Sequence, residues 1–304
     1  WYVDESGHNS TNWPGFTLSY RWLTRFSSLQ AYRLTRALPG IVGAAGGIRV
    51  AEPQDRLEKL SARLLRGFLR VGFRSFMGPP FAATTQRRVI GLFSVLTPGV
   101  GAVTRRQITV NAIATQVITP KKTKTGGVIL YLHGGAFCLG NAYSHRSITT
   151  RLAVESGMPV WLPEYRLAPE HPYPAAQDDV LACYDSLRKD YAAEQIVVAG
   201  DSAGGALALA LTLTLRERGD SSPAALLLIS PVTDSTLSGH TLVSKYGEDP
   251  MLRRSWLEQA LSWYKPPLDE SPLELDLSGL PPMLVQVGEQ ELLLSDSTQL
   301  AEHA

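Results

Sequence analysis

Apolar and polar positions follow two successive patterns along this chain. Between residues 55 and 77, "DRLEKLSARLLRGFLRVGFRSFM" repeats apolar residues at intervals of three and four, which predicts an amphipathic helix. From about residue 105, short continuous apolar runs bounded by glycine or proline take over, as in "GVILYLHGG" and "QIVVAGDS". Continuous runs of this length are typical of strands that are buried on both faces of a sheet.

These apolar runs alternate with helical segments. An opening antiparallel pair is expected in "RQITV" and "ATQVITP", and further strands in "MPVWLPEYRL", "AALLLISPV" and "PPMLVQVG". The helical period recurs between them in "RSITTRLAVESG", "AAQDDVLACYDSLRKDY" and "GGALALALTLTLRERG". This alternation predicts an α/β fold with a mostly parallel central sheet and helices on both faces.

The same patterns divide the chain into four segments. Residues 1–35 are aromatic-rich, residues 36–50 form a Gly/Ala-rich linker, residues 51–104 form a helical cap, and residues 105–304 form the main domain. Four arginines of the cap, spaced three or four residues apart, share one helix face: Arg63, Arg66, Arg70 and Arg74. A basic amphipathic helix can lie on a membrane surface, or it can cover an apolar site with its arginines in solvent. A second apolar segment, "RRVIGLFSVLTP", favours the covering role.

Charge and cysteine content narrow the class of protein. The net charge is +1, but residues 1–126 hold 18 basic and 5 acidic residues (+13), and residues 127–304 hold 11 and 23 (−12). We interpret this as a basic cap over an acidic domain and expect no nucleic-acid partner. The two cysteines, Cys138 and Cys183, lack metal-ligand spacing, which favours a reducing, cytoplasmic location without a metal. No apolar run approaches the roughly 20 residues of a membrane-spanning helix.

The stretch "IVVAGDSAGGALALAL" carries the clearest chemistry. Its residues 200–204 fit G-x-S-x-G, directly after a predicted strand and directly before a long predicted helix. In that context the glycines permit a sharp turn that exposes a serine hydroxyl above the sheet edge. Ser202 is therefore the candidate nucleophile, and the backbone N–H of Ala203 can donate to an oxyanion.

A second glycine-rich loop, "LYLHGGAFCLG", lies upstream of that serine. Gly134 and Gly135 follow a predicted strand, and their N–H groups, with that of Ala203, would supply three donors to a negative oxygen. Loss of one such donor typically costs about 10²–10³ in rate. We expect His133 to tether the loop and to take no part in the chemistry.

Three motifs in order, "HGGAF", "YRLAPEHPYPAA" and "GDSAGG", resemble those of the hormone-sensitive-lipase-like family of α/β-hydrolase esterases, and the likeness runs from about residue 50 to the end. The resemblance implies an α/β-hydrolase fold with eight strands and an N-terminal helical cap. It also implies hydrolysis of carboxylic esters of short to medium acyl chain, without a cofactor. One departure is Ala136, which replaces a third glycine that the family often has.

The resemblance implies an acid just beyond "MLVQVG". Glu291, three residues after Gly288, is the expected acid. Asp296 is the alternative, although "SDSTQL" is more typical of a helix N-terminus. Asp249 in "EDPML", and Glu170 with His171 in "APEHP", are expected to be structural.

The catalytic histidine is not found in this sequence. In the order Ser…acid…His, the base follows the acid, and five of the six histidines precede Glu291. The sixth, His303, would lie about 10 Å along a helix that runs away from the catalytic edge. We therefore expect a C-terminally truncated, almost inactive esterase whose base lies beyond residue 304. The alternative is a ligand-binding protein of the same fold, as in the plant gibberellin receptors, which resemble this family but lack that histidine.

Residues 1–35 carry a second, shorter resemblance. "WYVDESGHNSTNWPGFTLSYRWLTRF" is similar to the C-terminal tail of Baeyer–Villiger-type flavin monooxygenases. This implies a monooxygenase–esterase fusion, in which the first enzyme makes the ester that the second cleaves. The nucleotide-binding glycine motifs of such monooxygenases are not found in the sequence, so we expect no binding of FAD or NADPH.

Overall fold

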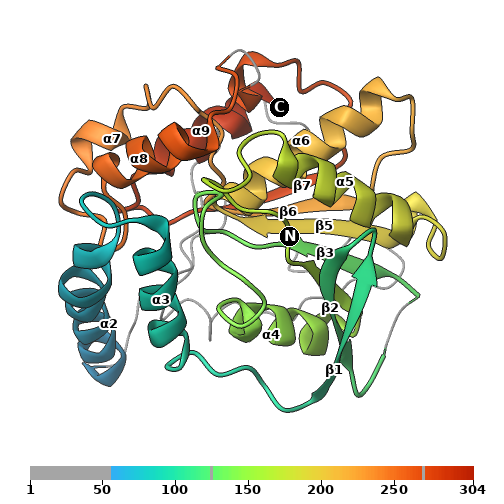
Figure 1. Ribbon diagram of the computed structural model, residues 1–304, viewed down its shortest axis with the longest axis horizontal. Helices are drawn as coiled ribbons and strands as arrows, with labels where there is room; N and C mark the ends of the chain where they lie inside the picture. The colour runs from blue at the N-terminus through green and yellow to red at the C-terminus, as the bar shows by residue number, and fades with distance from the viewer. Residues whose placement is uncertain (1–55, 124–125, 269–270) are drawn as a thin grey trace, which may run out of the picture.

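The computed structural model describes residues 56–123, 126–268 and 271–304 (Figure 1). The predictions for residues 1–35 and for the linker 36–50 lie outside the described residues. The helix predicted in the cap begins at residue 56, a second helix follows at residues 83–94, and the residues from 103 onward alternate strands with helices.

The described residues form one seven-stranded sheet in the order β1-β2-β4-β3-β5-β6-β7. β1 pairs antiparallel with β2 and β2 antiparallel with β4, whereas all other neighbours are parallel. The strands are β1 (Val103–Val110), β2 (Ile113–Pro120), β3 (Val128–Leu132), β4 (Val160–Pro163), β5 (Ile196–Asp201), β6 (Ala225–Ile229) and β7 (Met283–Gln286). The predicted mostly parallel sheet is confirmed, including its antiparallel opening pair.

Helices cover both faces of this sheet (Figure 1). α5 and α6 lie on one face and α4 lies on the other, while α7, α8 and α9 lie beyond the end of the sheet that faces the cap. Their bounds are α4 (Arg146–Ser156), α5 (Ala175–Leu187), α6 (Ala203–Glu217), α7 (Thr241–Ser244), α8 (Arg254–Tyr264) and α9 (Leu294–His303), with short 3₁₀ turns at Ala193–Gln195 and Pro272–Glu274.

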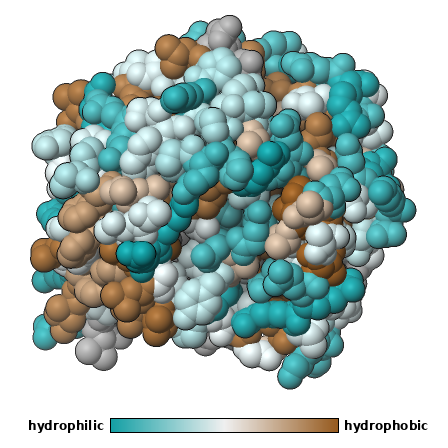
Figure 2. Space-filling model, in the orientation of Figure 1, coloured by the Kyte–Doolittle hydropathy of each residue, from teal (hydrophilic) through white to brown (hydrophobic). Residues whose placement is uncertain are grey.

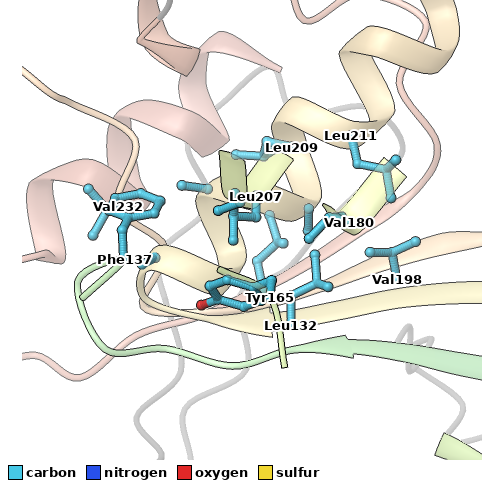
Figure 3. Packing of buried hydrophobic residues seen from close by; sticks show 14 of the residues in the cluster. Leu132, Phe137, Tyr165, Val180, Val198, Leu207, Leu209, Leu211 and Val232 are labelled. Carbon is cyan, nitrogen blue, oxygen red and sulfur yellow. The ribbon is translucent and has the colours of Figure 1, made fainter. Parts of the chain in front are cut away.

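The alternation of side chains along the central strands explains why helices form a layer on each face of the sheet. In β3, Leu130 and Leu132 belong to the core on the α5/α6 side, and Ile129 and Tyr131 to the core on the α4 side. Because successive side chains of a strand point to opposite faces, an entirely apolar strand needs a helix layer on each side. Figure 3 shows Leu132 in the larger core, packed among side chains of α5, α6 and β5.

The cap consists of α2 (Arg56–Phe68), which continues as a π-helical turn (Leu69–Phe73) and a 3₁₀ turn (Arg74–Phe76), and of α3 (Ala83–Ser94). It is attached to α8 by an edge-to-face contact between Phe73 and Trp256, with ring centroids 6.4 Å apart. A hydrogen bond of 2.9 Å from Gln86 Nε2 to Gln259 Oε1 adds a polar contact. None of the helices in the described part of the chain is both long and apolar enough to cross a membrane.

Candidate active site

Ser202 stands at the turn between β5 and α6, with φ 52° and ψ −118°. A residue with a Cβ rarely adopts this conformation, so surrounding contacts must hold it. The N–H of Ser202 donates to the carbonyl of Ile229 at 2.8 Å, and its carbonyl accepts from Val232 N–H at 3.1 Å. These bonds to the end of β6 fix the serine backbone at the carboxyl edge of the sheet.

Two glycines around Ser202 let the strand and the helix approach closely. A Cβ on Gly204 would lie 1.9 Å from the carbonyl oxygen of Leu132, and a Cβ on Gly200 would lie 2.4 Å from the carbonyl carbon of Gly204. Both contacts are to backbone atoms, which cannot move aside. The turn therefore requires glycine at these two positions, as the G-x-S-x-G pattern predicts.

The loop after β3 approaches the same turn, but its donors differ from the prediction. The N–H of Gly134 donates to Asp201 Oδ1 at 2.9 Å, so it is not free to bind a substrate oxygen. Among the described residues, the N–H groups of Gly135, Ala136 and Ala203 have no hydrogen-bond partner. Ala136 has φ 53°, a left-handed backbone conformation that was not predicted from the sequence.

Asp201, which precedes the serine, connects the two loops. Its Oδ1 also accepts from the hydroxyl of Tyr131 at 2.8 Å, and its Oδ2 lies 3.4 Å from Nε2 of His145. Burial alone would raise the pKa of Asp201, but His145 and the donated hydrogen bonds outweigh it and lower that pKa. Burial alone would lower the pKa of His145, but the Asp201 carboxylate outweighs it and raises that pKa. Each side chain therefore favours the charged form of the other at the serine turn.

His133 has the tethering position expected of it. Its side chain is fully buried, and its ring stacks on Tyr165 at 4.2 Å between centroids. Nδ1 lies 3.0 Å from the carbonyl of Gly134, and the Tyr165 hydroxyl donates to the carbonyl of His133 at 2.6 Å. Burial, followed by the nearby His145, lowers the pKa of His133 to about 3. A ring that stays neutral suits a tether within the core.

The two candidate acids lie beyond β7 in different surroundings. Glu291 is half-buried, its Oε1 accepts from Gly288 N–H at 2.9 Å, and its carboxyl is hydrogen-bonded by the side chain of Ser230. Asp296 is 2% exposed, and its Oδ2 accepts from the N–H groups of Thr233 and Asp234 at 2.9 and 3.1 Å. Burial raises the pKa of each carboxyl to about 7.

The link between Glu291 and Ser202 runs through the end of β6. Ser202 N–H bonds to Ile229, and the next residue, Ser230, bonds to Glu291. Asp296 instead holds the loop that follows β6. The structure thus brings Glu291 to the edge of the sheet where Ser202 stands.

Asp249 is a structural carboxylate, as expected. It is 2% exposed and accepts from the N–H groups of Met251, Leu252 and Leu292 at 2.7, 2.8 and 2.9 Å. These bonds fasten the "EDPML" loop to the residue next to Glu291.

The last histidine of the chain contacts the segment before β7. His303 ends α9, is exposed, and places Nε2 2.8 Å from the carbonyl of Leu275. That His303 is not the base stays a prediction.

Arg87 of α3 binds the cap to the loop that carries Gly135. Its guanidinium donates to the carbonyls of Cys138 and Ala168 at 2.8 Å each and forms an ion pair with Glu170 at 2.7 Å. This bidentate contact is the structural role of Glu170, and the hydrogen bonds from Arg87 lower the pKa of its carboxyl.

In the described part of the chain, no three His, Cys, Asp or Glu side chains gather as metal ligands. Cys138 and Cys183 are buried, unpaired thiols. Burial raises their pKa values to about 12 and about 11, which keeps both protonated and unreactive.

Comparison with known proteins places this site in a family. Residues 129–304 match the family described as the alpha/beta hydrolase fold, which is more than half of the chain. The chain belongs to the α/β hydrolase family. An esterase of Acinetobacter venetianus is 41% identical over 184 residues, 58% of this chain and 61% of the relative. An acetyl-hydrolase of Streptomyces hygroscopicus is 35% identical over 203 residues, 65% of this chain and 68% of the relative.

Solved structures of α/β hydrolases agree. An esterase from the bacterial hormone-sensitive lipase family has a TM-score of 0.73 at 32% identity, over 80% of this chain and 82% of that one. A hormone-sensitive lipase from a metagenome library has a TM-score of 0.75 at 33% identity, over 80% and 83%. These likenesses confirm the resemblance to hormone-sensitive-lipase-like esterases. The chain spans about three fifths of the length of the Acinetobacter esterase.

Sequence reasoning missed Asp201, His145 and Arg87. Asp201 occupies the variable position of the motif, and its partners are 56 to 70 residues away in the chain. Only its placement directly before the serine was visible in advance. No local signal marked His145 or Arg87.

Proposed function

We propose that this α/β hydrolase cleaves carboxylic esters of short to medium acyl chain, with Ser202 as the nucleophile. The observation that carries the proposal is the strained serine at the β5–α6 turn, with φ 52°. Such strain persists only where other contacts impose it, and here the bonds to β6 do so. The relatives named as an esterase and an acetyl-hydrolase support the same reaction class.

In this proposal, Ser202 Oγ attacks the ester carbonyl and transfers its proton to a base. The N–H groups of Gly135, Ala136 and Ala203 stabilise the oxygen that becomes negative, with Ala136 taking the place expected of Gly134. This role is supported because none of these three N–H groups has a hydrogen-bond partner among the described residues. Collapse of the tetrahedral intermediate expels the alcohol with the proton from the base, and water then hydrolyses the acyl-enzyme.

We assign the acid to Glu291, because Asp296 is enclosed and already holds two backbone N–H groups. A carboxylate at this position orients an imidazole and stabilises the imidazolium. Of the five described histidines, His133 and His145 are held in the core contacts above and His303 lies on α9. The other two, His171 and His240, are exposed and lie outside the helices and strands. We propose that the base comes from outside the described residues.

Chemical rescue tests this proposal. Loss of one triad member can cost about 10⁶ in kcat, so the 304-residue protein should hydrolyse p-nitrophenyl butyrate close to background. Added imidazole, acting as the base, should raise the rate, and Ser202→Ala should return it to that of imidazole alone. Ser262→Ala, on the exposed face of α8, is the matched control. Equal rates for the Ser202→Ala variant and the parent protein would refute the assignment.

The cytoplasmic location, the monooxygenase-like tail and the ligand-binding alternative stay predictions. The unpaired thiols Cys138 and Cys183 support a reducing compartment. The resemblance to a monooxygenase tail is based on residues 1–35 alone. Binding of an ester without any Ser202-dependent turnover, with or without imidazole, would favour the ligand-binding alternative.

A further inference from the structure

The outer surface of the cap exposes an apolar stripe and a basic stripe side by side on α2 and the π-helical turn that continues it. Leu60, Leu64, Phe68 and Val71 are 51%, 66%, 43% and 73% exposed. Among the larger apolar side chains described on this segment, Leu65 and Leu69 are half-buried and Phe73 is buried. Within the described part of the chain, this apolar stripe is uncovered.

α3 extends the apolar surface. Leu92, Val95 and Leu96, at its C-terminal end, are 70%, 59% and 64% exposed. Phe68 and Phe93 join the two helices, with ring centroids 5.1 Å apart. Figure 2 shows the hydrophobic surface gathered at the lower left, where Figure 1 places α2 and α3.

The basic stripe borders the apolar one on the same helix. At 100° per residue, Arg56 and Arg63 fall next to Leu60 and Leu64 on the helix circumference, and Lys59 and Arg66 lie just beyond. All four basic side chains are exposed. No ion pair within the described part of the chain involves any of them.

We propose that this cap face, formed by the exposed residues of α2 and α3, docks onto the surface of an anionic phospholipid bilayer. Apolar side chains flanked by arginine and lysine suit the boundary between acyl chains and headgroups. Long basic side chains can reach the phosphates while their stems lie along apolar surface. Charge complementarity selects an anionic lipid surface as the occupant.

Docking in this way would also fix the position of the active site. α3 carries Arg87, whose guanidinium holds the carbonyl of Cys138, three residues beyond Gly135. A cap bound to the membrane therefore keeps the oxyanion loop beside the interface. The inference does not depend on the esterase reaction, because lipid binding can be measured without turnover.

Vesicle sedimentation tests the proposal with the whole 304-residue protein. Vesicles of phosphatidylcholine mixed with phosphatidylglycerol should bind it at least about tenfold more tightly than phosphatidylcholine alone, and high salt should remove most of the difference. Equal binding to both, or none to either, overturns the proposal.

Matched variants locate the surface. The pair Leu60→Ser and Leu64→Ser should weaken vesicle binding about tenfold or more. The pair Leu268→Ser and Leu284→Ser, exposed elsewhere, should not change it. Likewise Arg63→Gln with Arg66→Gln should weaken binding, and Arg105→Gln with Arg106→Gln on β1 should not. Equal effects of test and control pairs contradict the assignment.

Light scattering of the free protein tests the alternative that a second copy of the chain binds this cap face. If the protein is a dimer that the Leu60 and Leu64 changes split, and vesicles do not bind, the face is a dimer interface and the proposal is wrong. Circular dichroism of each variant verifies that the fold is retained.

Discussion

Burial and charge act on single carboxyl groups around Ser202 in opposite directions. Asp201 has a lowered pKa because its partners favour the anion, whereas Glu291 has a pKa raised to about 7 because burial dominates. Asp201 thus stays ionised and holds Gly134 in place. Glu291 is poised near neutrality, where its ionisation controls whether it can stabilise an imidazolium.

Asp201→Asn tests the positioning role. An amide keeps the shape, and its oxygen can still accept from Tyr131 and Gly134, but it removes the charge and turns an NH₂ donor toward His145 Nε2. We expect the imidazole-rescued, Ser202-dependent kcat to fall by about 10–10² with little change in KM. The control is Asp185→Asn, which removes a surface ion pair with Arg218. A KM effect without a kcat effect would contradict this role.

Glu291 should make stability depend on pH. Its folded pKa of about 7 lies above the ordinary 4.5, so its contribution is fully present below about pH 4.5 and is lost as the pH rises through about 7. Urea unfolding should show Glu291→Gln gaining about 2 kcal/mol over the parent between about pH 5 and pH 8. Glu258→Gln, an exposed residue of α8, should follow the parent protein. Parallel profiles for the parent and Glu291→Gln would contradict the raised pKa.

Elements were predicted well where a repeating pattern determines them. The entirely apolar runs gave the buried strands, because such a run needs a helix layer on each face. The turn between β5 and α6 followed from glycines that no other residue can replace. The π-helical turn Leu69–Phe73 and the outward-facing Leu60 and Leu64 were not predicted, because periodicity shows that a helix has an apolar face but not what covers it.

In the candidate site, too, residues in local motifs could be predicted and residues that act through long-range contacts could not. Ser202 and Glu291 came from motifs that each lie within a few residues, whereas Asp201, His145 and Arg87 act through contacts between distant segments. Gly134 differed from the prediction for the same reason. A hydrogen bond to a carboxylate 67 residues away cannot be read from a local pattern.

The attachment of α3 gives a prediction at the element scale. Arg87→Ala removes two bonds to carbonyls and the Glu170 ion pair, so we expect the free energy of unfolding to fall by about 1–3 kcal/mol. The neighbouring Arg88→Ala, exposed on the same helix, should change it by less than about 0.5 kcal/mol. Denaturant unfolding measures both, and equal effects would show that the Arg87 contacts do not hold the cap.

At the scale of the whole molecule, the uneven charge distribution along the sequence follows the division between the cap and the sheet domain. The basic residues are concentrated in the segment that includes α2 and α3, and the acidic residues in the sheet domain that carries Ser202. The two parts are joined through α8 and through the loop that follows β3. We therefore propose that catalysis takes place at the sheet edge and that the cap binds a surface.

Covalent labelling tests the central claim, that Ser202 is the nucleophile of this α/β hydrolase, most directly. A fluorophosphonate loses fluoride to an activated serine and leaves a phosphonyl group on its oxygen, which peptide mass spectrometry locates. With imidazole supplied as the base, the account predicts one adduct, on the peptide that contains Ser202, and none in Ser202→Ala. An adduct on another residue, an equal labelling rate in Ser202→Ala, or no adduct at all would contradict it.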